Sequence, residues 1–272
     1  MLKESKITLK TTNRPIAFFD SGVGGLTVYT KLKSLLPEEN YIYFGDTKHM
    51  PYGEKTEAEL LEYADNIFNF FLSKNVKAVV MACNTTSSVI YDKIKDKYNV
   101  KIYPIIQSAA NIFAQLPVKK IGVFATPATI KSNVYKQEIQ KHNPDMEVIQ
   151  IACPEWVRIV EEHRINQPQS ILQIQEKLNE MLEYKPEKII LGCTHYPYLS
   201  KVLNKFAQQN DLFIDPSEYF AEFIKNDLIK NNLAENSQSI EEIYVSASPE
   251  NFKESAKMFY DIKTIPTLAL CD

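Results

Sequence analysis

The feature of this sequence that most constrains its fold is a repeated alternation of short apolar, β-branched runs with longer segments of helical periodicity. Runs such as AVVMA and IILG have no polar interruption, which is typical of strands buried on both faces. Strands of this kind, joined by crossover helices, form parallel sheets. The pattern therefore predicts an α/β fold built on parallel sheets.

The same alternation predicts the individual elements. We expect strands at residues 16–19, 41–44, 78–82, 100–106, 120–125, 147–152, 188–191, 212–214 and 243–245. We expect helices at residues 26–36, 56–73, 87–98, 130–142, 157–163, 170–184, 200–208, 219–231 and 249–259. Thr56 followed by Glu59 predicts a capping box at the start of the second helix.

A faint internal repeat divides the chain. IAFFDSG begins at residue 16 and IGVFATP at residue 121, and later strands end in ACNTT and GCTHY. Asp20 precedes Cys83 by 63 residues, and Thr126 precedes Cys193 by 67. Strand, small residue and helix recur in many α/β folds, but both halves here end on the same rare residue type. We therefore predict two similar parallel-sheet α/β lobes, related by internal duplication, that face each other across a cleft.

Composition and charge exclude several classes of function. The chain has 31 Lys and Arg against 34 Asp and Glu, a net charge of −3, and no long basic run. It therefore has no electrostatic basis for binding nucleic acid or an anionic membrane. No apolar run approaches the length of about 18 residues that a membrane span needs, and residues 1–15 lack the apolar region of a secretory signal. We expect a cytoplasmic protein with a short N-terminal tail.

The four cysteines are Cys83, Cys153, Cys193 and Cys271, which are too few and too scattered for a disulfide framework. None forms a C-x-x-C pair, and His195 is the one histidine within three residues of any of them, so we expect free thiols and no metal site. Cys83 and Cys193 each end a predicted strand. Ligands of open α/β sheets bind at that end of the strands, which marks these two thiols as chemical candidates.

The glycines gather at the strand ends as well. The chain has only seven, which suggests unusual backbone angles or close backbone approach where they occur. The segment DSGVGGLTV lacks the G-x-G-x-x-G spacing of a dinucleotide site, and Asp20 would repel a pyrophosphate. We expect Ser21 and the following helix N-terminus to bind a small carboxylate, and Asp20 to contact an ammonium or a thiol. The alternative for Ser21 is a simple N-cap.

Three further segments supply candidate contacts. The loop GDTKHMPYG would place Tyr52 and Gly53 over the cleft. ACNTTSS and LGCTHYP each follow a strand-end cysteine with hydroxyl, amide or imidazole groups that can bind a zwitterion. The alternatives are that Thr85 and Thr86 are helix caps and that His195 is a buried structural histidine. The match between the two cysteine segments favours a functional role.

The segments FFDSGVGGLTV, YFGDTKHMPYG, ACNTTSS and LGCTHYP resemble the glutamate racemase family, over nearly the whole chain from about Arg14. Aspartate racemases are similar in outline and share the two cysteines, but they usually carry Glu where His195 stands. The resemblance implies cofactor-independent racemisation of L- and D-glutamate, supply of D-glutamate for peptidoglycan, and a homodimer. It also implies that the C-terminal segment returns to the first lobe, giving lobes 14–107 plus 220–272 and 108–219.

Inversion of an α-carbon needs a base on one face and an acid on the other, and two thiols on opposed lobes meet that need. The resemblance implies that Cys83 acts on the D-enantiomer and Cys193 on the L-enantiomer. We expect helix N-termini after both cysteines to lower their pKa values. By position, Asp20 is the candidate partner of Cys83 and His195 that of Cys193.

The resemblance also implies further site residues. It places Glu161 near Cys193, although by sequence alone Glu161 is one charge on the solvated face of a helix. The implied substrate-binding residues are Asp20, Ser21, Tyr52, Gly53, Asn84, Thr85, Thr86, Thr194 and His195. Thr86 and Arg158 depart from the family, which commonly has Ala and Pro there.

Three alternatives stay open. One is an aspartate racemase. Another is a two-lobed amino-acid-binding protein without chemistry, which would need no thiol. The third is a cysteine hydrolase with Cys193 as nucleophile and His195 as base. A separation of two residues at a strand end makes that activation awkward, and Cys83 would have no role.

Overall fold

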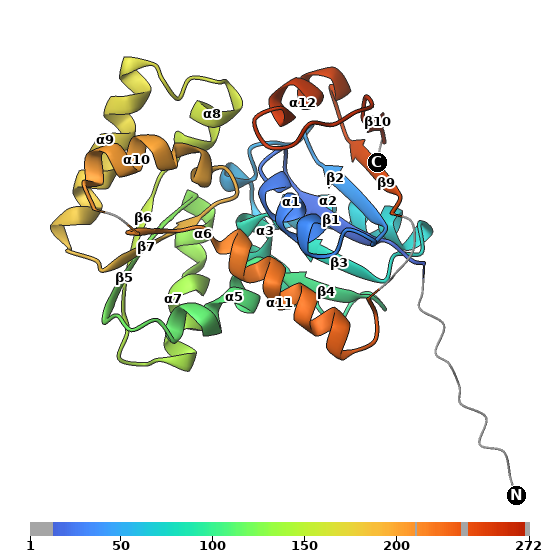
Figure 1. Cartoon of the computed structure of the whole chain (residues 1–272), viewed down its shortest axis with the longest axis horizontal. Coiled ribbons are helices and arrows are strands. Elements are labelled where there is room, and N and C mark those ends of the chain that lie inside the picture. The colour runs from blue at the N-terminus through green and yellow to red at the C-terminus, as the bar shows by residue number, and fades with distance from the viewer. Residues whose placement is uncertain (1–12, 210, 235–238, 270–272) are drawn as a thin grey trace, which may run out of the picture.

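The structure is a computed structural model that describes residues 13–209, 211–234 and 239–269. Two parallel sheets form two lobes side by side, as the sequence predicts, and the C-terminal strands lie in the first lobe (Figure 1). The first sheet has the order β10-β9-β2-β1-β3-β4, with β1 Ile16–Asp20, β2 Tyr41–Gly45, β3 Ala78–Met81, β4 Lys101–Pro104, β9 Glu241–Val245 and β10 Thr267–Leu268. The second has the order β6-β5-β7-β8, with β5 Lys120–Ala125, β6 Glu147–Ala152, β7 Lys188–Gly192 and β8 Phe213–Ile214.

The strand order of the second sheet repeats part of the first. In both, the first strand lies between the second and the third, so that β2-β1-β3-β4 corresponds to β6-β5-β7-β8. The chain thus reverses its direction of winding between β1 and β3, and again between β5 and β7. Such switch points open a crevice at the carboxyl ends of the strands. Asp20 and Cys83 flank the first crevice, and Thr126 and Cys193 flank the second.

Helices cover both faces of each sheet. Those of the first half are α1 Leu26–Leu35, α2 Glu57–Ser73, α3 Asn84–Val89, α4 Tyr91–Ile94 and α5 Ile105–Ala114, with a 3₁₀ turn η1 at Tyr52–Glu54. Those of the second half are α6 Pro127–Ser132, α7 Val134–His142, α8 Trp156–Glu161, α9 Pro168–Glu183 and α10 Ser200–Ala207, with η2 at Tyr196–Leu199. The chain then returns through α11 Pro216–Lys230 and α12 Pro249–Ala256.

The largest apolar cluster belongs to both lobes. Successive residues of β1 point to opposite faces, so Phe18 joins a cluster that also contains Val123 of β5, whereas Phe19 joins a separate cluster under α2. Between the two sheets, α5 packs against α7 and α11, and α11 packs against α1. The lobes therefore share one core and hold the two crevices in a fixed relation.

Most predicted elements are confirmed, including the capping box, in which Thr56 and Glu59 bond each other's backbone. The predicted strand 100–106 is wrong at its end, because β4 stops at Pro104 and the missed helix α5 begins there. A short apolar run does not distinguish a buried strand from a buried helix. The predicted helix 130–142 is divided at Asn133, which adopts a left-handed conformation with φ of 59°. The two-residue strand β10 was also missed.

Two expectations concern other parts of the chain. None of the helices among the described residues is both long and apolar enough to cross a membrane. Cys83, Cys153 and Cys193 are free thiols, as predicted. Cys271 and most of the predicted N-terminal tail lie outside the described residues.

Helix α11 offers a test of the shared core, because two isoleucines lie on its opposite faces. Ile224 is fully buried in the shared core, and Ile229 is 51% exposed. We expect Ile224→Ala to lower the free energy of unfolding by about 2–5 kcal/mol through the cavity it leaves. The same change at Ile229 should stay within about 0.5 kcal/mol. Urea unfolding measures both, and equal effects would contradict this packing.

Candidate functional site

One cavity lies where the carboxyl ends of the two sheets meet. It encloses about 290 Å³ of space, part of it open to solvent. Its lining residues are Ser21, Pro51, Tyr52, Gly53, Cys83, Asn84, Thr85, Thr126, Val157, Cys193, Thr194 and His195. Nine of these are residues that the sequence singled out as site candidates. Three were not, namely Pro51, Thr126 and Val157, and neither Pro51 nor Val157 carries a sequence signal that could have found it.

Two glycines explain how closely the lobes meet here. A Cβ on Gly24 would lie 2.5 Å from Thr194 Oγ1, and one on Gly53 would lie 2.8 Å from Thr126 Cβ. None of the seven glycines has a positive φ. Of the two reasons the sequence offered for scarce glycine, close backbone approach is the one that applies, and unusual backbone angles with positive φ are not found at these glycines.

Cys83 is the N-cap of α3, and the backbone N–H groups of Thr85 and Thr86 face its sulfur. These groups lower its pKa, but burial raises it more, and the nearby Asp20 carboxylate adds to that effect. The net result is a pKa of about 12. The expectation that the helix N-terminus would favour the thiolate is therefore wrong, because desolvation outweighs it. Cys83 is a protonated thiol at neutral pH.

Cys193 begins a chain of polar contacts. Its Sγ lies 3.8 Å from His195 Nδ1, and His195 Nε2 lies 2.5 Å from Glu161 Oε1. Burial lowers the pKa of His195, but the contacts with Cys193 and Glu161 outweigh burial and raise it well above its usual value. The raised pKa of His195 favours the imidazolium form, whose ring lies between the Glu161 carboxylate and the Cys193 sulfur.

The contacts from Cys193 through His195 to Glu161 change two interpretations of the sequence. Glu161 does not lie on a solvated helix face, because its carboxylate bonds His195 and is only 13% exposed. The separation of two residues also allows Cys193 and His195 to touch, contrary to the argument that their pairing would be awkward. Glu161 itself stands behind His195 and not in the cavity wall.

Asp20 is fully buried at the end of β1, behind the cavity wall. Its carboxylate accepts hydrogen bonds from the Gly22 N–H at 3.1 Å and from the Thr194 hydroxyl at 3.3 Å. The Gly25 N–H, at the N-cap of α1, also faces it. These N–H groups therefore serve Asp20, whereas the sequence assigned them to a ligand carboxylate. Gly25 caps α1, so Ser21 is not its N-cap and instead lines the cavity.

Hydroxyl and amide groups complete the wall. Thr85 Oγ1 and Thr126 Oγ1 lie 3.0 Å apart and join the lobes. Asn84 Oδ1 accepts from the Tyr135 hydroxyl at 2.7 Å, while Asn84 Nδ2 is buried without a hydrogen-bond partner among the described residues. A buried donor without a partner is costly, so this N–H₂ is suited to a ligand acceptor. Thr86 is turned away, since its hydroxyl donates to the Cys83 carbonyl and it is not part of the lining.

Comparison with known proteins gives concordant results. A sequence model of the Asp/Glu/hydantoin racemase family matches residues 24–224. A glutamate racemase of Thermoanaerobacter sp. (strain X514) is 40% identical over 247 residues, which are 90% of this chain and 92% of the relative. The Francisella tularensis glutamate racemase, solved with D-glutamate, is 33% identical with a TM-score of 0.87 and covers 96% of this chain and 98% of its own.

A more distant structure holds the other enantiomer. The Escherichia coli glutamate racemase, solved with L-glutamate and the activator UDP-MurNAc-ala, is 26% identical with a TM-score of 0.75. The match covers 94% of this chain and 98% of that one.

The burial of Asp20 has a measurable consequence for stability. Burial raises its pKa from 3.8 to about 6, so the folded protein holds this proton more tightly than the unfolded chain does. The stability that protonated Asp20 contributes is present below pH 4 and is lost as the pH rises through 6. The corresponding cost at neutral pH is about 3 kcal/mol. We expect Asp20→Asn to raise the free energy of unfolding at pH 7.5 by up to that amount and to flatten its dependence between pH 4 and 6.

Urea unfolding at a series of pH values tests this expectation. Asp145→Asn, at an exposed carboxylate, is the control and should leave the profile unchanged. If Asp20→Asn were destabilised equally at every pH, the carboxylate would be a structural cap and not a strained group.

Proposed function

This chain belongs to the Asp/Glu/hydantoin racemase family, and from that membership we propose that it interconverts L-glutamate and D-glutamate by two-thiol acid–base catalysis. The observation that carries the mechanism is that Cys83 and Cys193, from equivalent strand ends of the two lobes, line one cavity. A substrate held between them presents one face of its α-carbon to each sulfur. That arrangement supplies the base and the acid that inversion requires.

The raised pKa of Cys83 suits one direction of the reaction, the conversion of L- to D-glutamate. In the conversion of L- to D-glutamate, a Cys193 thiolate takes the α-proton, and the Cys83 thiol gives its own proton to the opposite face. The product is D-glutamate, with Cys83 left as thiolate and Cys193 as thiol. The raised pKa of Cys83 supports its role as the acid, and the His195 ring, 3.8 Å from the Cys193 sulfur, is placed to assist proton transfer at that thiol.

The conversion of D- to L-glutamate requires the opposite protonation of the two thiols. Cys83 must then be the thiolate, which burial and the Asp20 carboxylate disfavour. A bound substrate carries an ammonium group into the same space, and a positive charge there stabilises both the Asp20 carboxylate and the Cys83 thiolate. We therefore assign to Asp20 the task of attracting the ammonium and managing the charge around Cys83. Cys83 acts on the D-enantiomer and Cys193 on the L-enantiomer.

The remaining wall groups provide substrate contacts. Asn84 Nδ2 is a buried donor suited to a carboxylate oxygen, and the Thr85 and Thr194 hydroxyls lie beside the two thiols. Hydrogen bonds to the α-carboxylate also stabilise the charge that spreads onto it when the α-proton leaves. Ser21 and the Tyr52–Gly53 segment complete the enclosure from the first lobe.

The similarity to proteins named as glutamate racemases favours glutamate over aspartate as substrate. A binding protein without chemistry would have no use for two thiols in its wall. The Cys193–His195–Glu161 chain has the order of a hydrolase nucleophile, base and orienting acid, but a hydrolase would leave Cys83 without a task.

We extend the proposal to the setting of the reaction. The resemblance to glutamate racemases supports supply of D-glutamate for peptidoglycan, a cytoplasmic location and a homodimer. The two thiols of the proposed site lie in one chain, so the chemistry does not require a partner copy.

Replacing either thiol tests the mechanism directly. We expect Cys83→Ala and Cys193→Ala each to abolish racemisation of both enantiomers, since either direction needs both an acid and a base. Circular dichroism of pure L- or D-glutamate incubated with the protein measures this. Cys153→Ala removes a buried free thiol outside the cavity and is the control, which should keep its activity. Near-normal turnover in either cavity variant would exclude the two-thiol mechanism, and turnover of aspartate alone would exclude glutamate as substrate.

Isotope exchange distinguishes two bases from one. In D₂O, each enantiomer should acquire deuterium first in the product it forms, because the thiol that delivers the proton has exchanged with solvent. Mass spectrometry of the separated enantiomers at early times measures this. Product that retains the original proton would indicate one base acting on both faces.

A further inference from the structure

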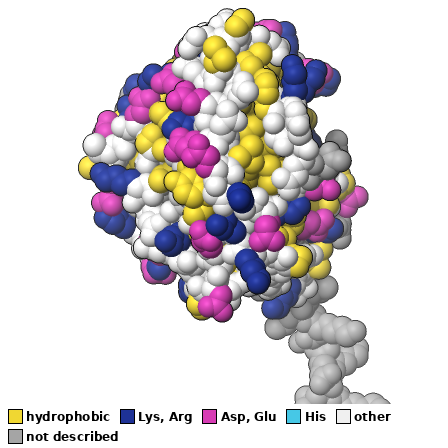
Figure 2. All heavy atoms as spheres, turned by 90° about the vertical axis from the view of Figure 1, so that its left-hand side faces the viewer, with side chains coloured by type: hydrophobic (Ala, Val, Ile, Leu, Met, Phe, Trp, Pro, Cys, Tyr) yellow, Lys and Arg dark blue, Asp and Glu magenta, His cyan; other side chains and the backbone are white. Residues whose placement is uncertain are grey.

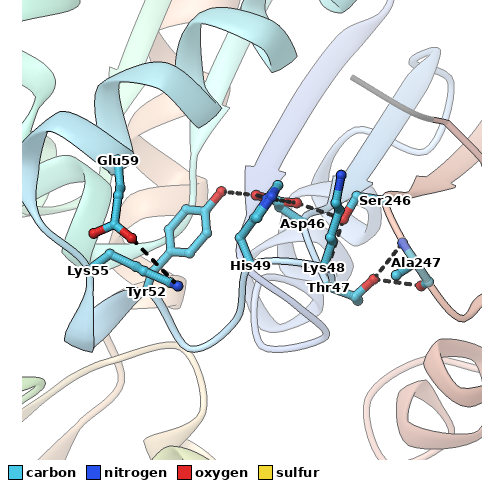
Figure 3. Close-up of polar contacts among 9 residues, drawn as sticks. All are labelled: Asp46, Thr47, Lys48, His49, Tyr52, Lys55, Glu59, Ser246 and Ala247. Atoms are coloured by element: carbon cyan, nitrogen blue, oxygen red, sulfur yellow. Dashed lines mark hydrogen bonds and ion pairs between the residues drawn. The ribbon is translucent and has the colours of Figure 1, made fainter. Parts of the chain in front are cut away.

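Asp46 is a buried acid outside the cavity that collects several hydrogen bonds. It follows β2 directly and is 2% exposed. Its carboxylate accepts from the Tyr52 hydroxyl and from the Ser246 hydroxyl at 2.6 Å, and it lies 2.8 Å from His49 Nδ1 (Figure 3). Three groups from the loop and from the end of β9 therefore meet on one carboxylate.

The backbone of Asp46 is held equally firmly. Its N–H donates to the Asp20 carbonyl at 2.9 Å, which fixes the end of β2 to the end of β1. The Ser246 N–H donates to the Gly45 carbonyl at 3.2 Å, and this ties in the end of β9. Asp46 is thus held in place at the start of the loop 46–53, and the hydroxyl of Tyr52, near the end of that loop, donates to its carboxylate.

Tyr52 connects this point to the cavity. Its side chain is 1% exposed, with the hydroxyl on Asp46 and the ring edge-on to Phe19. Tyr52 and Gly53 line the cavity, and Gly53 lies against Thr126 of the second lobe. The position of this wall is therefore set by where the Tyr52 hydroxyl is held.

We propose that Asp46 is a positioning residue for substrate binding, which acts through the Tyr52 hydroxyl to hold the Tyr52–Gly53 wall of the cavity. This inference rests on the proposed racemase function. Asp46 does not line the cavity, and its carboxylate is joined to the lining through the Tyr52 hydroxyl, so its effect reaches the substrate through the wall. A wall that contacts ground state and transition state alike contributes uniform binding, which appears in KM more than in kcat.

Asp46→Asn is the first test. The three groups on Asp46 all donate to it, and an amide offers only one accepting oxygen. At least one donor then loses its partner. We expect KM for glutamate to rise about tenfold, which is typical of losing one charge-assisted hydrogen bond, with kcat and its pH profile nearly unchanged.

Tyr52→Phe separates positioning from general damage. It removes only the hydroxyl that reaches Asp46, and it should raise KM by a similar factor. Because both changes act through one contact, the double variant should show little further increase in KM. Thr47→Val is the matched control. It breaks the bonds between Thr47 Oγ1 and the backbone of Ala247, which attach the same loop to the same strand end (Figure 3). It should lower the melting temperature without raising KM.

The outcomes are distinct. An unchanged KM in Tyr52→Phe, or KM effects that multiply in the double variant, would overturn the positioning role. A rise in KM for Thr47→Val that follows the loss of melting temperature would show that loop stability alone is responsible. If Asp46→Asn does not fold, Tyr52→Phe against Thr47→Val still decides the question. Failure of the racemase proposal itself would appear separately, as a wild-type protein that does not act on glutamate.

Discussion

The removal of charged and ionisable groups from water at the junction of two sheets is the constraint on which the site depends. Asp20, Cys83 and His195 are all buried where the carboxyl ends of β1, β3 and β7 meet. In such surroundings each group's protonation is decided by its immediate partners, because water no longer screens them. Burial raises the pKa values of Cys83 and Asp20, whereas the contacts with Cys193 and Glu161 raise the pKa of His195.

The two thiols are therefore equivalent in topology but different in electrostatics. Cys83 has an acid as its neighbour and Cys193 has a cationic imidazole. The repeated strand order places the two sulfurs at equivalent strand ends of the two lobes. The residues added around each sulfur break that symmetry. An enzyme that runs a reaction between mirror images thus uses a site whose two halves are not mirror images.

The sequence predicted the architecture and most of the wall because both depend on local signals. Buried parallel strands are continuous apolar runs, and the residues just after them gather at one edge, which is why Cys83, Asn84, Cys193 and Thr194 were found. Thr86 was misplaced because it shares a motif with Thr85, and successive helical residues point in different directions. Contacts between distant segments were not predictable. The bond from Glu161 to His195 and the pKa of Cys83 both depend on burial, which one sequence does not report.

The outer face of the second lobe carries a mixture of apolar, charged and neutral side chains. Figure 2 shows the side of the second lobe, where a stripe of apolar side chains runs between charged and neutral ones. Leu172 of α9 and Tyr184, the C-cap of that helix, are exposed large apolar residues of the second lobe. The junction between the lobes differs, because it holds buried polar groups such as Asp20, Asn84 and His195.

The shared core determines whether either lobe could be stable alone. The inner faces of both sheets, together with α5, α7 and α11, form one apolar cluster. Either lobe alone would leave that surface in water, at a cost proportional to the apolar area exposed. We therefore expect neither lobe to stay folded without the other, so that the two crevices and the thiols beside them are formed or lost together.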